Sequence, residues 1–265
     1  AEGVKNVKKV LEFTKENNLV VIVSAMGKMT NALEGVVNHY FHQQHELESS
    51  LSEVYNYHLK IVEGLFPNTT HPIYGALTNW FGDLRGFLET NKSKNHAFVY
   101  DQVVSYGELV STTIVSAYLN ENGVANTWLD VRQCIKTDDY YRDARVDWEE
   151  TQNQITATVS NKGVTITQGF LGAEAENNFT TTLGREGSDY TAAIFGYCLN
   201  AESVTIWKDV PGVLNADPRF FSNTQLLHHI SYREAIELAF YGASVIHPKT
   251  LQPLQRKEIP LYVKS

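Results

Sequence analysis

The sequence predicts an α/β fold in which a mainly parallel sheet is covered by helices. Near the start, apolar residues recur with helical spacing and lead into the continuous apolar run Leu19–Val23. A run of this kind is typical of a parallel strand that is buried on both faces. The same alternation of helical and strand patterns returns in the middle of the chain and near its end. Such alternation favours a parallel sheet with helices packed against it.

The predicted elements follow one another along most of the chain. The first helix is indicated by Val4, Val7, Val10 and Leu11, and the first strand follows it. Apolar runs and period-two alternation predict further strands at Ala97–Tyr100, Val124–Val131, Thr151–Thr158, Gly163–Gln168, Ser203–Trp207 and Ile259–Val263. Helical spacing predicts helices at Gly107–Glu121 and Asp189–Leu199.

The stretch from about residue 34 to residue 91 differs, because it shows little strand pattern. Its apolar residues, among them Leu51, Val54 and Val62, fall on one helical face. We interpret this stretch as a helical insertion. No Pro/Ser-rich linker divides the chain, so any boundary between lobes must be tight. We place that boundary near residue 150, between a lobe of residues 1–150 and a lobe of residues 151–265.

Composition and charge restrict the class of protein. The 265 residues, 43% of them hydrophobic, are enough to bury a substantial core. A formal net charge of −8 at pH 7 would repel a nucleic-acid backbone, and no basic stretch is present for an anionic membrane. No apolar run approaches the roughly 20 residues needed to cross a bilayer. The only cysteines, Cys134 and Cys198, lack metal-binding spacing. We expect a cytoplasmic protein that binds neither nucleic acid nor membrane.

The most informative segment is T-T-T-L-G-R-E-G-S-D-Y-T-A-A, residues 180–193. Gly184 and Gly187 permit backbone conformations closed to other residues, and Ser188 is expected to cap the following helix. Free N–H groups at the start of a helix attract anions. Arg185 offers a planar fork to a carboxylate, and Asp189 offers an acceptor to an ammonium group. The pair matches both charges of an amino acid, although a capped helix with a solvated ion pair fits the same spacing.

Two further segments place polar groups where open sheets bind ligands. Ser24, Gly27 and Thr30 follow the strand Leu19–Val23, and ligands bind beyond the carboxyl ends of parallel strands. The hydroxyl groups of Ser24 and Thr30 are candidates for hydrogen bonds to a substrate carboxylate. Glu108, in S-Y-G-E at the start of a helix, is a candidate for binding an ammonium group. Taken alone, the segment that holds Ser24 and Thr30 would usually be an ordinary turn. Acidic residues such as Glu108 are favoured at helix N-termini without any ligand, so only the combination with other segments makes Glu108 a candidate.

A long loop, I-W-K-D-V-P-G-V-L-N-A-D-P-R at residues 206–219, follows a predicted strand. Gly212, after a proline, favours a tight turn. Asp209 is suited to a ribose hydroxyl, and Arg219 is suited to phosphate oxygens. These residues indicate nucleotide binding. By itself the loop also fits two structural turns, the second beginning at Asp217.

Taken together, these segments resemble the aspartate kinases of the amino acid kinase family. V-S-A-x-x-x-x-T, S-Y-G-E, T-L-G-R-E-G-S-D-Y-T-A, I-W-K-D-V-P-G-V and N-A-D-P-R occur in the family's order. The resemblance implies a three-layer α/β/α sandwich of the carbamate kinase-like type, with an N-terminal amino-acid lobe and a C-terminal nucleotide lobe. It implies a homo-oligomer that uses ATP to convert L-aspartate to 4-phospho-L-aspartate. This reaction is the first step towards lysine, threonine and methionine.

The resemblance also implies a role for each matched residue. Arg185 would pair with the substrate α-carboxylate, and Asp189 and Glu108 would hold the ammonium group. We predict Arg185 and Asp189 to be the catalytic residues. The other residues of the aspartate site would be Ser24, Thr30 and Ser188. The nucleotide, ATP with Mg²⁺ bridging its phosphates, would be surrounded by Lys208, Asp209, Gly212, Asp217, Arg219 and Lys249.

The sequence departs from the family pattern in several places. Family members begin with a strand ending in Lys-Phe-Gly-Gly-Thr-Ser, which holds the transferring phosphate, and this sequence starts after that strand. We therefore expect this polypeptide to be nearly inactive while still binding its ligands. Ser244 stands where many relatives carry a lysine near the nucleotide, and Lys249 is expected to replace it. The regulatory ACT domains that normally follow are absent from the sequence.

Two alternative functions stay open on the sequence alone. One is an amino acid kinase that acts on glutamate, and the other is a non-catalytic module that binds an amino acid or a nucleotide. A metal site built from protein side chains is not predicted. His39, His42 and His45 are three residues apart, but they rotate around a helix and lack a fourth ligand.

Overall fold

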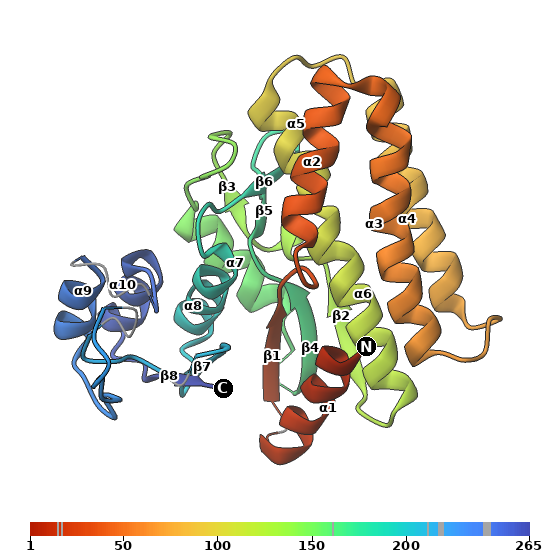
Figure 1. Ribbon diagram of the computed structural model, residues 1–265. Helices are drawn as coiled ribbons and strands as arrows, with labels where there is room; N and C mark the ends of the chain where they lie inside the picture. The colour runs from red at the N-terminus through yellow and green to blue at the C-terminus, as the bar shows by residue number, and fades with distance from the viewer. Residues whose placement is uncertain (15, 17, 161, 211, 217–219, 241–244) are drawn as a thin grey trace.

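The computed structural model describes residues 1–265 apart from 15, 17, 161, 211, 217–219 and 241–244 (Figure 1). Its helices are α1 Glu2–Thr14, α2 Met29–His42, α3 Gln44–Leu65, α4 Pro72–Thr90, α5 His96–Val104, α6 Tyr106–Glu121, α7 Trp148–Thr158, α8 Gly187–Leu199, α9 Tyr232–Phe240 and α10 Pro248–Arg256. Its strands are β1 Asn18–Val23, β2 Asn126–Leu129, β3 Lys136–Thr137, β4 Gly163–Gln168, β5 Leu171–Glu174, β6 Thr180–Thr182, β7 Val204–Trp207 and β8 Leu261–Lys264. No helix within these ranges is long and apolar enough to span a bilayer.

The strands pair almost entirely in parallel. β4 lies between β1 and β2, and both neighbours run parallel to it. In a second sheet β3 and β5 are parallel, while β5 and β6 are antiparallel. β7 and β8 form a parallel pair near the C-terminus. The described strands confirm the predicted mainly parallel arrangement, although hydrogen bonds divide it into three sheets.

The side chains of β1 show that the first sheet is covered on both faces. Val21 and Val23 pack against a core that includes helices α2 to α6, whereas Val20 and Ile22 pack against a second core that includes α7 and α8. Alternate residues of a strand point to opposite faces of its sheet. The sheet is therefore the middle layer between two sets of helices, as the predicted α/β/α sandwich requires (Figure 1).

The stretch predicted as a helical insertion is largely helical, while its standing as an insertion stays a prediction. Helices α2, α3 and α4 lie side by side and bury apolar residues such as Leu33, Val54 and Phe81 (Figure 1). The first of these helices begins at Met29, shortly after the end of β1. This group of helices therefore starts at the carboxyl edge of the sheet, and Thr30 lies in the first turn of α2.

Two segments predicted as strands are helices, and in both cases a capping residue explains the difference. The side chain of Asn95 accepts hydrogen bonds from the N–H groups of the first residues of α5, so Ala97–Tyr100 is helical. The side chain of Asp147 caps α7 in the same way, so Thr151–Thr158 is helical as well. The apparent alternation of that second segment was misleading, because its buried residues lie four positions apart on one helical face.

A third core lies in the C-terminal part of the chain. It joins β7, β8 and α10 through residues such as Ile206 and Leu254, and it includes Ala193 of α8. Helix α8 therefore contributes to two cores and connects the first sheet with the β7–β8 pair. The second core takes side chains from both sides of residue 150, among them Ile135 and Ile155, as tightly packed lobes would. The division into lobes at that residue stays a prediction.

One buried carboxylate connects three segments that are distant in the sequence. Asp101 of α5 is fully buried and accepts hydrogen bonds from the backbone N–H of Arg142, at 3.1 and 3.0 Å to its two oxygens. The same carboxylate accepts from the backbone N–H and the hydroxyl group of Thr182, each at 2.8 Å. Burial raises the pKa of Asp101 to about 6, and the hydrogen bonds oppose that shift. Asp101 thereby fixes α5, the loop 138–146 and β6 relative to one another.

We expect the substitution Asp101→Ala to lower the free energy of unfolding by about 3 kcal/mol or more. It leaves the two buried donor groups of Thr182 and the partly buried N–H of Arg142 without an acceptor, and each buried unpaired group costs roughly 1–3 kcal/mol. Urea denaturation followed by circular dichroism measures the change. Asp83→Ala, at an exposed position of α4, is the matched control and should stay within about 0.5 kcal/mol of the parent. A loss below about 1 kcal/mol for Asp101→Ala would contradict this role.

Candidate functional site

A pocket of about 550 Å³ lies where the carboxyl ends of β1 and β4 face the first turn of α8. It is lined by every residue predicted for the aspartate site and by one residue predicted for the nucleotide site. These residues are Ser24, Thr30, Glu108, Arg185, Ser188, Asp189 and Lys208. Four segments of the sequence that were identified separately therefore meet at one place.

Helix α6 is attached to the end of β1 by two hydrogen bonds. Glu108 Oε1 accepts from the backbone N–H of Ala25 at 3.2 Å, and the hydroxyl group of Ser111 donates to the carbonyl oxygen of Ser24 at 2.7 Å. Gly107 allows this close approach, because a Cβ atom there would lie 3.0 Å from the side chain of Ala25. The motif S-Y-G-E thus brings a carboxylate to the carboxyl edge of the sheet.

The carboxylate of Glu108 has unusual electrostatics. Its side chain is buried, and within the described part of the chain its Oε2 atom has no hydrogen-bond partner. Burial raises the pKa of Glu108 to about 8, against the opposing effect of the hydrogen bond from Ala25. Buried polar atoms are nearly always paired, so an unpaired acceptor that lines a pocket indicates a place for a ligand donor.

The turn that carries Arg185 requires glycine at two positions, for its backbone conformation at Gly184, as the sequence predicted, and for lack of space at Gly187. Gly184 has a φ of 78°, and a Cβ atom there would lie 2.5 Å from Asp143 Oδ1. A Cβ atom on Gly187 would lie 2.6 Å from the ring of Phe170. Both positions therefore exclude larger residues.

The predicted cap of α8 was wrong. The N-cap residue is Glu186, in the left-handed conformation with a φ of 54°, and no side chain caps the helix. Because α8 begins at Gly187, Ser188 lies within its first turn rather than before it. Ser188 instead lies directly against Gly169 at the end of β4, where a Cβ atom on the glycine would overlap Ser188. The close contact presses the start of α8 against the end of the strand.

Lys208, the residue that follows β7, is the partner of Asp189. Its Nζ atom lies 2.8 Å from Asp189 Oδ2, in an ion pair without hydrogen-bond geometry, and 4.0 Å from Glu186 Oε2. It also donates a hydrogen bond to the carbonyl oxygen of Val245 at 2.6 Å. Both side chains of the Lys208–Asp189 pair are largely buried, at 21% and 17% exposed, so the attraction is only partly screened by water.

Arg185 lines the same pocket without a protein partner for its guanidinium group among the described residues. The surface ion pair between Arg185 and Asp189, which the sequence left open as an alternative, does not form, because Asp189 pairs with Lys208. A guanidinium group without a carboxylate partner is suited to bind a ligand carboxylate or phosphate in a bidentate manner.

Backbone strain gathers at this pocket. Arg142, Phe170 and Glu186 have φ values of 73°, 68° and 54°, and all three line it. Left-handed conformations are uncommon for bulky residues, and they cluster at functional sites. Sequence reasoning missed Arg142 and Phe170, because a positive φ at a residue other than glycine leaves no signal in the sequence. Glu186 lay inside a recognised motif but received no role.

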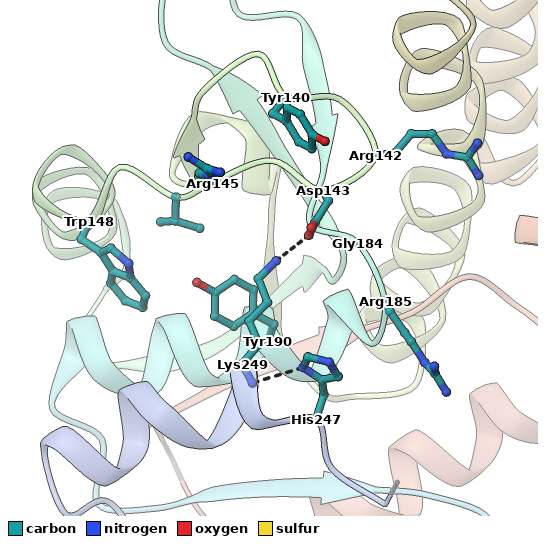
Figure 2. Close-up of a pocket in the computed structure, with 11 residues that line it drawn as sticks. Tyr140, Arg142, Asp143, Arg145, Trp148, Gly184, Arg185, Tyr190, His247 and Lys249 are labelled. Carbon is teal, nitrogen blue, oxygen red and sulfur yellow. Dashed lines mark hydrogen bonds and ion pairs between the residues drawn. The ribbon is translucent and has the colours of Figure 1, made fainter. Parts of the chain in front are cut away.

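A second pocket of about 730 Å³ adjoins the first and shares Arg142, Gly184 and Arg185 with it. Figure 2 shows Lys249 near its centre, paired with Asp143; its Nζ atom donates a hydrogen bond to Asp143 Oδ1 at 2.8 Å. The same atom also donates to the carbonyl oxygen of Leu183 at 3.0 Å. The backbone N–H of Lys249 donates to His247 Nδ1, the N-cap of α10. Lys249 therefore lies beside the first pocket, and its proposed contact with the nucleotide stays a prediction.

Among the described residues predicted to bind the nucleotide, Asp209 and Gly212 do not line the pocket that contains Lys208. Asp209 is exposed and lines neither pocket. Gly212 forms a turn with a φ of 138°, packed against Leu226. Asp217, Arg219 and Ser244 lie outside the described residues. Within the described part of the chain, no group of three or more His, Cys, Asp or Glu side chains is placed to hold a metal ion.

The chain matches known proteins over its whole length. A model of the amino acid kinase family matches residues 2–265. Lysine-sensitive aspartokinase 3 of Escherichia coli is 36% identical over 254 residues, which is 94% of this chain and 55% of that protein. The crystal structure of E. coli aspartokinase III in complex with aspartate and ADP has a TM-score of 0.90 at 33% identity, covering 100% of this chain and 58% of that one.

A more distant structure agrees with these matches. The aspartate kinase of Clostridium acetobutylicum has a TM-score of 0.79 at 25% identity and covers 99% of this chain and 56% of its own. The chain thus spans somewhat more than half the length of these relatives. The similarity confirms the resemblance to aspartate kinases and the sandwich fold that the resemblance implied. The chain belongs to the amino acid kinase family.

Proposed function

We propose that the chain is the catalytic part of an ATP-dependent aspartate kinase. Such an enzyme transfers the γ-phosphoryl group of ATP to the side-chain carboxylate of L-aspartate, giving 4-phospho-L-aspartate and ADP. The observation that carries this proposal is the convergence of the separately predicted aspartate-binding residues on one pocket. Further support comes from the similar E. coli enzyme, which was crystallised with aspartate and ADP.

The charges of the pocket complement a free amino acid. Arg185, which has no carboxylate partner among the described residues, binds the α-carboxylate. Glu108, with its unpaired Oε2 atom, accepts a hydrogen bond from the ammonium group, and Asp189 assists it from the start of α8. The hydroxyl groups of Ser24, Thr30 and Ser188 complete the site.

The nucleotide binds on the side of Lys208. This lysine reaches the pocket from the end of β7, at the start of the loop that the sequence assigned to ATP. The loop contributes Asp209, Gly212, Asp217 and Arg219. Mg²⁺ binds with the nucleotide, held mainly by phosphate oxygens as is usual for this ion. Assembly into a homo-oligomer and a cytoplasmic location stay predictions from the sequence.

The reaction requires alignment and cations rather than a protein nucleophile. The substrate carboxylate is ionised at neutral pH and attacks without a general base. Phosphoryl transfer depends mainly on positioning and on positive charge that offsets the charge of the transferring group. Lys208 supplies such a charge at the boundary between the two ligands, and Asp189 fixes its position.

Arg185→Ala is expected to lower the affinity for aspartate about 10- to 100-fold, because it removes a charge-assisted bidentate contact. Calorimetric titration of the chain with aspartate, in the presence of ADP and Mg²⁺, measures the affinity. Glutamate, one methylene longer, should bind more weakly than aspartate. Arg233→Ala, at an exposed position of α9, is the control and should bind as the parent does. Tighter binding of glutamate, or unchanged binding by Arg185→Ala, would contradict the proposed substrate or the proposed role.

Aspartate binding at pH 7 should release a proton from Glu108. The pKa of this group is raised to about 8 in the free chain, so it is mainly protonated at pH 7. The ammonium group of the ligand favours the carboxylate form, so affinity rises with pH between about 6 and 8. Titrations in buffers of different ionisation enthalpy count the protons. Glu108→Gln should bind more weakly and release none from this site, and equal proton release by parent and variant would refute the assignment.

A further inference from the structure

Arg142 has a strained backbone conformation that its own side-chain type does not favour. Its φ of 73° lies in the left-handed region, which bulky residues seldom occupy. Asn178 and Asn200 share that region, but asparagine tolerates it through its short polar side chain. Glycine would adopt the same conformation without strain. An arginine retained in such a conformation points to a role for its side chain.

Asp101 holds Arg142 in this conformation. Its carboxylate accepts the backbone N–H of Arg142 through both oxygens and simultaneously binds Thr182. Thr182 ends β6 and is followed closely by the turn that carries Arg185. One buried carboxylate therefore sets the relative positions of the two arginines that line the pocket.

The guanidinium group of Arg142 is held weakly by its present partners. It lies 3.3 Å from Glu34 Oε1, but the two side chains are 45% and 41% exposed, and exposed ion pairs contribute little. It also stacks at 4.0 Å over the ring of Tyr100, and this stacking leaves the N–H groups at its edge able to bond either to Glu34 or to a ligand. In Figure 2 the side chains of Arg142 and Arg185 both extend away from the Asp143–Lys249 pair. Exchanging Glu34 for a ligand carboxylate would therefore lose little binding energy.

The charges of the pocket require a second cation for a substrate with two carboxylates. Of the three described cations that line it, Lys208 is paired with Asp189, and the proposed function assigns Arg185 to the α-carboxylate. Glu186 and Asp189 would repel a second carboxylate that had no cation beside it. Arg142 is the remaining cation of the described lining.

We propose that Arg142 is a specificity-determining residue that binds the side-chain carboxylate of a dicarboxylic amino acid. The inference rests on the proposed function and deepens it. Arg185 and Arg142 each bind one carboxylate of the substrate. Asp101 fixes the distance between the two arginines through its hydrogen bonds to Arg142 and Thr182. On binding, the guanidinium group of Arg142 exchanges Glu34 for the ligand while it stays stacked on Tyr100.

A series of substitutions at position 142 tests the proposal by calorimetric titration with aspartate and, separately, with ADP and Mg²⁺. Arg142→Gly removes the guanidinium group together with the strain, so the variant should be at least as stable to heat as the parent. Its affinity for aspartate should fall about 10-fold, as expected for the loss of one charge-assisted hydrogen bond. Arg142→Gln should lose as much, and Arg142→Lys should stay within about 3-fold of the parent. Affinity for ADP should change less than 2-fold.

Two variants serve as matched controls. Arg145→Gln removes the same charge from the same loop, but Arg145 lines only the second pocket, so aspartate affinity should change less than 2-fold. Glu34→Gln removes the present partner of Arg142 and should leave aspartate affinity equal or higher. Weaker binding by Glu34→Gln would show that the ion pair, rather than the available guanidinium group, supports the pocket.

The outcomes separate this proposal from the proposed function. If the parent binds aspartate and Arg142→Gly binds it equally well, the role of Arg142 is refuted while the kinase assignment stands. A loss of ADP affinity in place of aspartate affinity would assign Arg142 to the nucleotide and overturn the proposal as well. A parent chain that binds no aspartate would contradict the proposed function and, with it, this inference.

Discussion

The buried carboxylate of Asp101 is the interaction on which the geometry of the site depends. Its hydrogen bonds to Arg142 and Thr182 connect helix α5, the loop 138–146 and strand β6, which share no other common anchor of this kind among the described contacts. A buried acceptor with three well-placed donors has few alternative arrangements, since any displacement leaves a polar group unpaired. The loop and the turn at Arg185 therefore keep fixed positions, even though neither belongs to regular secondary structure.

The pocket that these segments form contains charged side chains that are paired within the protein and others that are not. Lys208 and Asp189 neutralise each other across the junction between β7 and α8. Glu108 and Arg185 have opposite charges when both are ionised, and each has bonding capacity that the described residues leave unused. The unfilled capacity matches a zwitterion, whose ammonium and carboxylate groups can satisfy both. Because Asp189 is already paired with Lys208, it does not form an ion pair with Arg185.

The sequence predicted the α/β alternation and the aspartate site because both depend on local patterns. The strand Leu19–Val23 shows its burial as a continuous apolar run, and Arg185 and Asp189 lie within one glycine-bordered motif. Other features depend on contacts that no local pattern reveals. The strand predicted at Ala97–Tyr100 is a helix because Asn95 caps it, and Ser188 is no cap because the close contact with Gly169 places it inside the first turn. Arg142 was missed because its conformation is imposed by Asp101, 41 residues earlier.

The close contact between Gly169 and Ser188 restricts which residues can stand at position 169. Any side chain at position 169 would push the amino end of α8 outward and carry the Arg185 turn with it. The position of the amino end of α8, which lines the pocket, is thus set in part by the backbone at Gly169. Widening the pocket at this end would therefore require movement of helix α8, in addition to any change in the side chains that line it.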